Sequence, residues 1–300
     1  MTRRQFDRVL AKALPLPAPR LARVRLGLVL AVLTALTLFA VRAEAQGAPR
    51  FAAGDAVSLA PASYAMAPVP FAVGEQLTYK VHFGGIPAGT ARMTVANIET
   101  VRGRPAYHVV FTIEGGIPFY RVRDRYESWI DVQTLASLRH VQQIAEGGYK
   151  RHTTYEIYPE RAQYRKNDEP LQPSVHQPLD DGSFIYAVRA AGLRVGEVRR
   201  DDRYFRPDRN PVVLAGVGTE TVKVGAGRFA STVVKPSIRA NGLFSENGDA
   251  QIWFSDDANR YPVQVKTKFS KFSLTLTLQD VVEGDRLAQE QRVAALVADR

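Results

Sequence analysis

Short segments in which apolar and polar residues alternate recur along most of this sequence, and they limit its possible folds more than any other feature. In one such segment, Leu77, Tyr79 and Val81 are separated by polar residues, so one face of a strand is apolar and the other polar. Glycine and proline residues mark turns between the segments. The gaps are too short for the helices that connect parallel strands, so neighbouring strands are expected to be antiparallel.

We therefore expect a mainly β fold, with one large antiparallel meander over residues 71–282 that forms a half-open barrel or curved sheet. A β-sandwich is the alternative, because alternation is the same in both. Residues 183–191 have helical spacing and predict one short central helix, with Asp181 or Ser183 as the cap at its start and Gly192 as the cap at its end. Residues 283–300 predict an exposed C-terminal helix.

The N-terminal segment has the pattern of a secretory signal. Basic residues precede an uncharged apolar stretch at 26–41, and the small residues Ala43 and Ala45 suit a cleavage site. We expect a signal peptide at 1–45, an Ala/Pro-rich linker at 46–70 and a periplasmic location. A retained inner-membrane anchor is the alternative, and Arg3-Arg4 leaves the twin-arginine export route open beside the general one.

The charge of the chain argues against a nucleic-acid partner. The formal net charge is +10, but residues 1–45 hold eight Lys and Arg and two Asp and Glu. The remaining 32 basic and 28 acidic residues leave only +4, and no base-stacking platform is evident. Because the chain has no cysteine, it forms no disulfide and no thiolate metal site.

No recognisable catalytic or cofactor motif stands out in the sequence. The five histidines form no zinc-type spacing, and a G-x-S-x-G serine motif is missing. The glycines at 225 and 227 precede strand-like residues, so they indicate a hairpin rather than a dinucleotide site. We expect no metal, no cofactor and no enzymatic activity.

A row of arginines is the candidate contact for an anionic group. Arg121, Arg123 and Arg125 would share one face of a strand, where they could meet phosphate or an acidic lipid headgroup. Contact with a membrane surface is compatible with this row. A solvated face that pairs with nearby acids is the alternative.

Three stretches resemble one bacterial family. They are GEQLTY at 74–79 with IPAG at 86–89, VGAGRF at 224–229, and IWFSDDANRYPV at 252–263. Together they are similar to the bacterial domain-of-unknown-function family 3108, over roughly residues 71–282. The resemblance implies an exported, uncharacterised β-rich protein with a short central helix, and it carries no catalytic residues. A looser likeness, in architecture alone, is to periplasmic lipoprotein carriers.

The leading functional hypothesis is a non-enzymatic envelope protein that carries a lipid-like ligand in a β-barrel concavity. Aromatic residues on the apolar faces are the candidate lining: Tyr79, Phe83, Phe111, Tyr126 and Trp253. One alternative is a scaffold with an envelope protein as its partner. Another is an envelope hydrolase that would use His82 or His108 beside a carboxylate. The pattern does not indicate an oligomeric state.

Overall fold

The protein is described by a computed structural model, which covers residues 66–237, 249–269 and 272–298. The predicted signal peptide at 1–45 and most of the predicted linker at 46–70 lie outside the described residues. At the end of that linker, Val69 and Pro70 are buried, and Val69 packs in a core cluster with Phe71.

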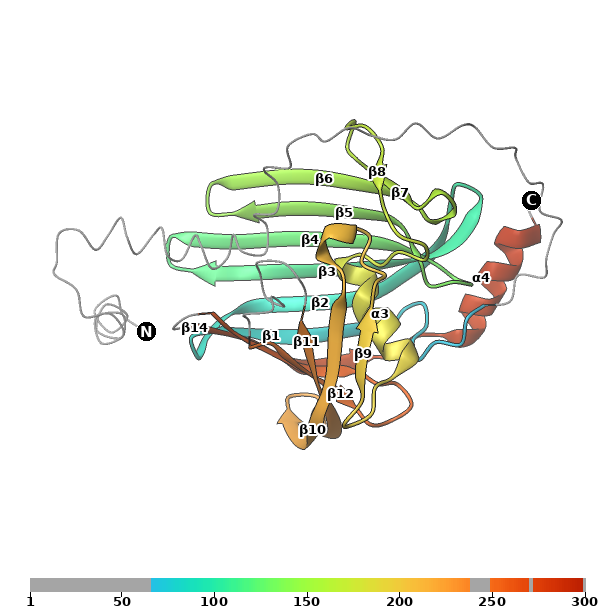
Figure 1. The fold of residues 1–300 in the computed structure, drawn as a ribbon. Coiled ribbons are helices and arrows are strands. Elements are labelled where there is room, and N and C mark those ends of the chain that lie inside the picture. Colours follow the sequence, from blue (N-terminus) through green and yellow to red (C-terminus); the bar gives the residue numbers. More distant parts are fainter. Residues whose placement is uncertain (1–65, 238–248, 270–271, 299–300) are drawn as a thin grey trace. The chain divides into compact units, whose positions relative to one another are not determined.

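The described residues form one antiparallel sheet of fourteen strands (Figure 1). The first eight are β1 Gln76–Phe83, β2 Ile86–Val101, β3 Arg104–Ile117, β4 Tyr120–Asp131, β5 Ser137–Glu146, β6 Tyr149–Tyr158, β7 Gln163–Lys166 and β8 Gln172–Pro173. The last six are β9 Val198–Asp201, β10 Val212–Val224, β11 Gly227–Ser237, β12 Gln251–Ser255, β13 Pro262–Phe269 and β14 Phe272–Val282. The helices are α3 Asp181–Ala191 and α4 Arg286–Ala298, with 3-10 turns at Pro159–Arg161 and Pro207–Arg209.

The strand order shows two meanders joined in the middle of the sheet. The first wing (β1–β8) and the second wing (β9–β14) each run from neighbour to neighbour, and β1 pairs with β14 to join them. This is one continuous sheet rather than the two sheets of a sandwich. The expected mainly β fold, an antiparallel curved sheet with a central and a C-terminal helix, is confirmed.

The sheet curls around α3. Phe184 and Val188 of this helix pack in one buried cluster with residues of β6 and β7 from the first wing and of β10, β11 and β12 from the second. In Figure 1, β10 and β12 cross the strands of the first wing steeply, with α3 beside them. An isolated bridge between Leu179 and Tyr204 links the two chain segments that follow the edge strands. The helix therefore occupies the concave side of the sheet.

The central helix begins earlier than its spacing predicts. It starts at Asp181, and its N-cap is Asp180 rather than Asp181 or Ser183. Asp180 accepts hydrogen bonds from the amides of Gly182 and Ser183, and the Ser183 side chain bonds back to the Asp180 amide, which makes a capping box. Gly192, with φ of 67°, ends the helix as expected.

The C-terminal helix lies against the sheet through a narrow stripe. Gln289 and Val293 are buried, while most other side chains of α4 are exposed. The Gln289 Oε1 atom accepts a hydrogen bond from the Val73 amide at 3.0 Å, and Val293 joins the cluster of Val69 and Phe71. This helix therefore also fixes the segment that leads into β1.

Candidate functional site

A network of hydroxyl groups holds the N-terminal end of α3 against the first wing. The Ser128 hydroxyl of β4 donates to Asp180 Oδ1 at 2.6 Å. The Asp180 amide donates to Ser137 Oγ of β5 at 2.9 Å, and Ser137 Oγ lies 2.7 Å from Ser183 Oγ. A Cβ atom on Gly182 would stand 2.5 Å from Ser128 Oγ, so only glycine lets the helix approach β4 this closely.

Ser128, His140 and Asp180 have the residue types of a hydrolytic triad but not its arrangement. Ser128 Oγ lies 3.1 Å from His140 Nδ1, and the same hydroxyl bonds directly to Asp180. In a triad the histidine stands between the serine and the carboxylate. The three residues are at most 1% exposed, and Asp180 Oδ1 also caps the helix. This trio anchors α3.

Two carboxyl groups meet on the inner side of β4 and β5. Asp124 and Glu146 are buried, and the Asp124 Oδ2 and Glu146 Oε1 atoms find no hydrogen-bond donor among the described residues. The pKa of Glu146 is raised to about 8, mainly by burial and secondly by the negative charge of Asp124. Burial also raises the pKa of Asp124. Glu146 therefore keeps its proton at neutral pH, and that proton supplies a hydrogen bond between the two carboxyls.

A buried ion pair holds the C-terminal end of α3. The Arg189 guanidinium donates two hydrogen bonds to Glu75, at 2.6 Å and 2.9 Å, and a third to the Asn259 carbonyl at 3.0 Å. Burial lowers the pKa of Arg189, but the hydrogen bonds and charge of Glu75 outweigh this and raise it overall. Arg189 also lies over the rings of Phe71, Tyr186 and Tyr261, at 5.5 to 5.7 Å from their centres.

The stretch at 252–263 forms the end of β12, a polar turn and the start of β13. Asp257 accepts hydrogen bonds from the amides of Asn259 and Arg260, and Ser255 Oγ accepts one from the Tyr261 amide. The Arg260 side chain then donates to the carbonyls of Arg189 and Ala190 at the end of α3. Two of the stretches that carry the family resemblance, around Glu75 and Arg260, thus meet at Arg189.

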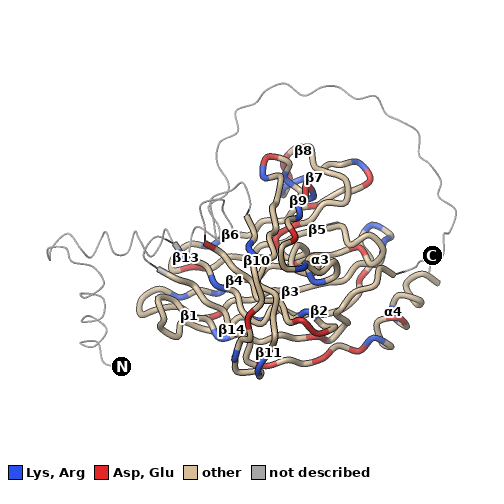
Figure 2. The backbone as a smooth tube through the Cα atoms, turned by 60° about the horizontal axis from the view of Figure 1, so that its bottom comes forward, with Lys and Arg blue, Asp and Glu red and all other residues tan. Residues whose placement is uncertain are grey.

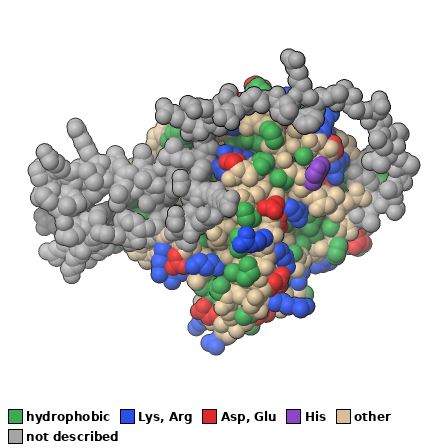
Figure 3. All heavy atoms as spheres, in the orientation of Figure 1, with side chains coloured by type: hydrophobic (Ala, Val, Ile, Leu, Met, Phe, Trp, Pro, Cys, Tyr) green, Lys and Arg blue, Asp and Glu red, His purple; other side chains and the backbone are tan. Residues whose placement is uncertain are grey.

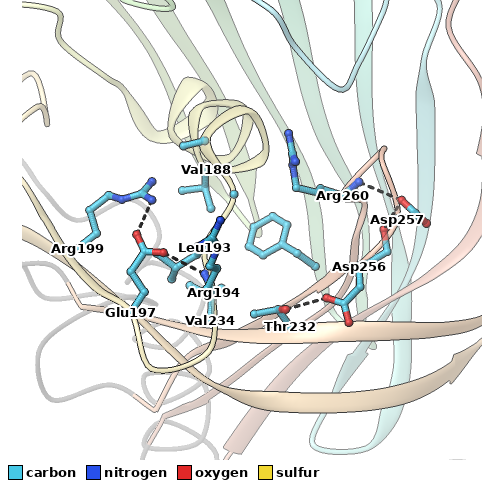
Figure 4. Close-up of a pocket in the computed structure, with 14 residues that line it drawn as sticks. Val188, Leu193, Arg194, Glu197, Arg199, Thr232, Val234, Asp256, Asp257 and Arg260 are labelled. Carbon is cyan, nitrogen blue, oxygen red and sulfur yellow. Dashed lines mark hydrogen bonds and ion pairs between the residues drawn. The ribbon is translucent and has the colours of Figure 1, made fainter.

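A pocket of about 500 Å³ opens beside this end of α3 (Figure 4). Its apolar lining comes from α3, the segment after it and strands β11 and β12: Val188, Ala191, Leu193, Val234 and Phe254. Its charged lining comes from the β12–β13 turn and the segment before β10: Arg194, Glu197, Arg199, Asp256, Asp257 and Arg260. The arrangement suits a molecule with an apolar part and a polar end.

Most of the charged groups at this pocket already have partners. Arg199 pairs with Glu197 at 2.6 Å, and Asp256 accepts a hydrogen bond from Thr232 at 2.7 Å (Figure 4). Asp257 and Arg260 are held within the turn and against the helix. The Arg194 guanidinium makes no hydrogen bond or ion pair with a described residue. This arginine is therefore the group with donors available for a ligand.

None of the five aromatic residues predicted to line a ligand site contacts this pocket. Tyr79 and Trp253 are buried in a core cluster, where Trp253 Nε1 donates to Glu220 at 2.8 Å. Phe111 packs against the same cluster, with its ring centre 6.2 Å from that of Tyr126. Phe83 is half-buried at the end of β1. Their role as a ligand lining stays a prediction.

The arginine row lies on the opposite face of β4 from Asp124. Arg121 and Arg123 are exposed, while Arg125 donates to Glu127 at 2.8 Å. His108 lies between Glu99 and Glu127, at 3.2 Å and 2.8 Å, and stacks on Trp129. His82 is half-buried on β1. His108 thus has the carboxylate neighbours that the hydrolase alternative requires, but it does not line the pocket.

Sequence reasoning missed the groups that fix α3. Arg189 is the one charged residue within the apolar run after Ser183, and this isolation was the available signal. Among the described residues, no group of three or more histidine, aspartate or glutamate side chains is arranged to hold a metal. Within the same residues, no helix combines the length and apolar character needed to cross a membrane.

The chain has matches among known families and solved structures. The family model described as "Protein of unknown function (DUF3108)" matches residues 78–279. No curated protein matches the chain in sequence.

Three solved structures give low similarity scores. A beta-barrel-like DUF1849 protein from Brucella abortus is 11% identical, with a TM-score of 0.47 over 73% of this chain and 100% of that one. A protein with a YmcC-like fold from Bacteroides fragilis is 12% identical, with a TM-score of 0.30 over 73% and 100%. Protein CT021 from Chlamydia trachomatis is 7% identical, with a TM-score of 0.33 over 71% and 89%. Scores this low carry no argument about function.

Proposed function

This chain belongs to the DUF3108 family of proteins of unknown function, and because that family prescribes no reaction, we propose a function from the pocket. The protein acts without catalysis as an extracytoplasmic binding protein for a small amphiphile. The ligand's apolar tail lies against Val188, Val234 and Phe254, and its acidic head meets Arg194. The observation that carries this proposal is one pocket in which apolar side chains lie beside charged groups, among them Arg194.

The size of the pocket supports a small-molecule ligand. Ligand sites typically enclose about 300–1,000 Å³, and the 500 Å³ here lies within that range. The lining is more polar than in most such sites, because eight of its fourteen residues are charged or carry a hydroxyl group. Val188 and Phe254 also belong to the core cluster around α3, so packing holds this side of the pocket rigid.

The charges at the rim support an acidic head group. Arg199 is neutralised by Glu197, and Arg260 is engaged by helix carbonyls. Arg194 offers a guanidinium that can bind a carboxylate or phosphate through two parallel hydrogen bonds. Arg194 is exposed and therefore hydrated in the free protein, so an acidic head group would replace water at this guanidinium.

The same geometry moves the proposed ligand away from the aromatic residues. Tyr79 and Trp253 pack in a core cluster, and α3 occupies the concave side of the sheet. A ligand among these aromatics would have to displace packed side chains. A ligand beside the end of α3 requires no such displacement. The predicted export signal at 1–45 supports a location in the periplasm, where such a protein would meet membrane-derived amphiphiles.

A fluorescent fatty acid tests the proposal directly. The probe is dansyl-labelled undecanoic acid, titrated into the protein purified from cells. We expect saturable binding with a blue-shifted emission. Ala191→Trp should fill the pocket and weaken binding at least about tenfold, because the tail loses its apolar surface. The matched control is Ala294→Trp on the exposed face of α4, which should bind as the wild type does.

Arg194→Gln separates the head from the tail. It should weaken binding of the acidic probe about tenfold but leave binding of the uncharged probe N-phenyl-1-naphthylamine unchanged. If the protein shows no saturable uptake of either probe, or if Ala191→Trp binds the fatty-acid probe as tightly as the wild type, the proposal is wrong.

A further inference from the structure

Three hairpin turns project from one end of the first wing. In an antiparallel meander alternate turns lie at the same end, and the register places the β1–β2, β3–β4 and β5–β6 turns together. The β3–β4 turn carries Phe119, whose exposure of 90% is the highest of any large apolar residue described. Tyr149 follows the β5–β6 turn and is 44% exposed.

The backbone at Phe119 holds the ring out into solvent. Its φ is 71°, in the left-handed region that glycine or asparagine usually fills and that a bulky residue seldom adopts. Tyr120, the next residue, is buried on the inner side of β4. The turn therefore presents an aromatic ring at a position that gains nothing from the core. A single exposed apolar residue is ordinary on a protein surface, so the significance of this ring depends on the side chains around it.

Basic side chains surround these turns on the outer face of the sheet. Arg121 and Arg123 stand next to the Phe119 turn, and Lys150 follows the β5–β6 turn; all three are exposed. Lys80 and Arg92 extend the same face across β1 and β2. Figure 2 shows where Lys and Arg lie along the backbone.

Among the described residues, few acids offset this charge near the turns. Glu114, opposite Arg123, is exposed. Asp124 and Glu146 are buried on the other face, and Glu146 holds a proton at neutral pH. Elsewhere the surface differs, because in the view of Figure 3 basic and acidic side chains are interspersed. The turn end thus combines an exposed aromatic ring with a positive surface.

We infer that this end of the first wing docks on an anionic lipid bilayer, with Phe119 inserted among the headgroups and Arg121, Arg123 and Lys150 against their phosphates. Phenylalanine rings beside basic side chains are typical of protein surfaces that bury apolar groups at the boundary between headgroups and acyl chains. Each basic residue near an anionic surface strengthens binding about fivefold. The proposal does not depend on the pocket beside α3, so each fails or stands alone.

The ring's insertion gives the most direct test. Phe119→Trp places a fluorophore at the turn, while the native Trp129 and Trp253 are buried. In the protein purified from cells, vesicles of equal parts phosphatidylglycerol and phosphatidylcholine should shift the emission of the introduced tryptophan to the blue. Brominated lipid in these vesicles should quench it. The matched control, Leu287→Trp on the exposed face of α4, should show neither effect.

Sedimentation with the same vesicles tests the charges. Arg121→Glu with Arg123→Glu should weaken binding at least about 25-fold, from the loss of two basic residues. The matched pair Arg161→Glu with Arg165→Glu, exposed at the other end of β6 and on β7, should bind like the wild type. Phe119→Ser should weaken binding about tenfold.

The fluorescence and sedimentation experiments have outcomes that either support or overturn docking through this end of the first wing. An emission shift of the Phe119→Trp variant that needs phosphatidylglycerol supports the proposal. No shift, or an equal shift with vesicles of phosphatidylcholine alone, overturns it, whatever the N-terminal segment contributes to sedimentation. Equal binding by the two double variants also overturns the assignment of this face.

Discussion

The two ends of α3 are held against the sheet by different chemistry. At the N-terminal end, serine hydroxyls and the Asp180 carboxylate satisfy the free amides of the first turn. At the C-terminal end, the Arg189–Glu75 pair and the Arg260 side chain satisfy carbonyls and charges. Both choices follow the polarity of the helix, whose amides point toward its start and whose carbonyls point toward its end.

The contrast between the two ends of α3 indicates where this fold has space for a ligand. The hydroxyl network is compact and lets the helix touch β4 directly, with Gly182 against Ser128. At the other end, long arginine side chains bridge the helix and the β12–β13 turn. The pocket lies beside them and is lined by residues of both α3 and the turn. Substitutions at the two ends of α3 should therefore differ in how much stability they remove and in whether they affect ligand binding.

The largest loss of stability is expected at the C-terminal end. Glu75→Ala leaves Arg189 buried without its carboxylate, and breaking a buried ion pair in this way costs about 3–5 kcal/mol. Urea denaturation followed by circular dichroism measures the change in the free energy of unfolding.

A double replacement serves as the control. Glu75→Leu with Arg189→Met removes both charges and keeps apolar volume, so it should restore most of the lost stability. A loss below about 1 kcal/mol for Glu75→Ala would contradict the role given to this pair.

The next effect should appear in the pH dependence, and it belongs to the first wing alone. The pKa of Glu146 is about 8 in the folded protein and 4.5 as its ordinary value. Between these values the folded state binds more protons than the unfolded state, so stability falls as pH rises from about 4.5 to about 8. We expect Glu146 to contribute about 2–4 kcal/mol to this fall.

Glu146→Gln should flatten that part of the curve, since its amide can donate to Asp124 at every pH. Urea midpoints at about pH 5, 6.5 and 8 measure this, with exposed Glu114→Gln as the matched control that should keep the wild-type slope. If the wild type and Glu146→Gln lose stability equally across this pH range, Glu146 and Asp124 do not share a proton in the folded protein.

Removal of the cap at the N-terminal end of α3 should cost less stability than removal of Glu75 at the other end. Asp180→Ala deprives the Gly182 and Ser183 amides and the Ser128 hydroxyl of one acceptor, at a cost of about 2 kcal/mol. Asp180→Asn keeps an acceptor oxygen and should cost less than about 1 kcal/mol. Thermal melts of the two variants give the comparison, and equal losses would mean that the charge, not the cap, matters.

The sequence predicts the strands better than it predicts their arrangement. Alternation in segments such as 76–83 marks strands, because one face of each meets the core. It does not reveal that β1 pairs with β14, because the same pattern fits any neighbour. Strands β7, β8 and β9, at or next to the two edges of the sheet, are too short for a periodic signal.

The site is less predictable than the fold, because its residues come from distant segments. Glu75 and Arg189 are 114 positions apart, and Ser128 and Asp180 are 52 apart. No local pattern reports such contacts. The aromatic residues illustrate the opposite problem, because Tyr79 and Trp253 on an apolar strand face have the same pattern in a packed core and in a ligand cavity. Only packing distinguishes the two.

The smallest loss of stability is expected at Arg260, where the comparison between the two ends becomes a test of function. Arg260→Ala removes the side-chain hydrogen bonds to the Arg189 and Ala190 carbonyls and a positive charge near the helix end, which together cost about 1 kcal/mol. Arg260→Lys restores the charge but cannot reach both carbonyls with the same planar geometry, so it should recover only part of this stability. Urea denaturation gives the order of stability among the wild type and the two variants.

Arg260 also lines the pocket, so Arg260→Ala should weaken binding of the fatty-acid probe. Asp180→Ala, at the other end of α3, should leave the affinity for this probe unchanged under conditions in which the protein is folded. Equal effects of both variants on probe affinity would mean that the pocket responds to the helix as a whole, and the distinction between its two ends would fail.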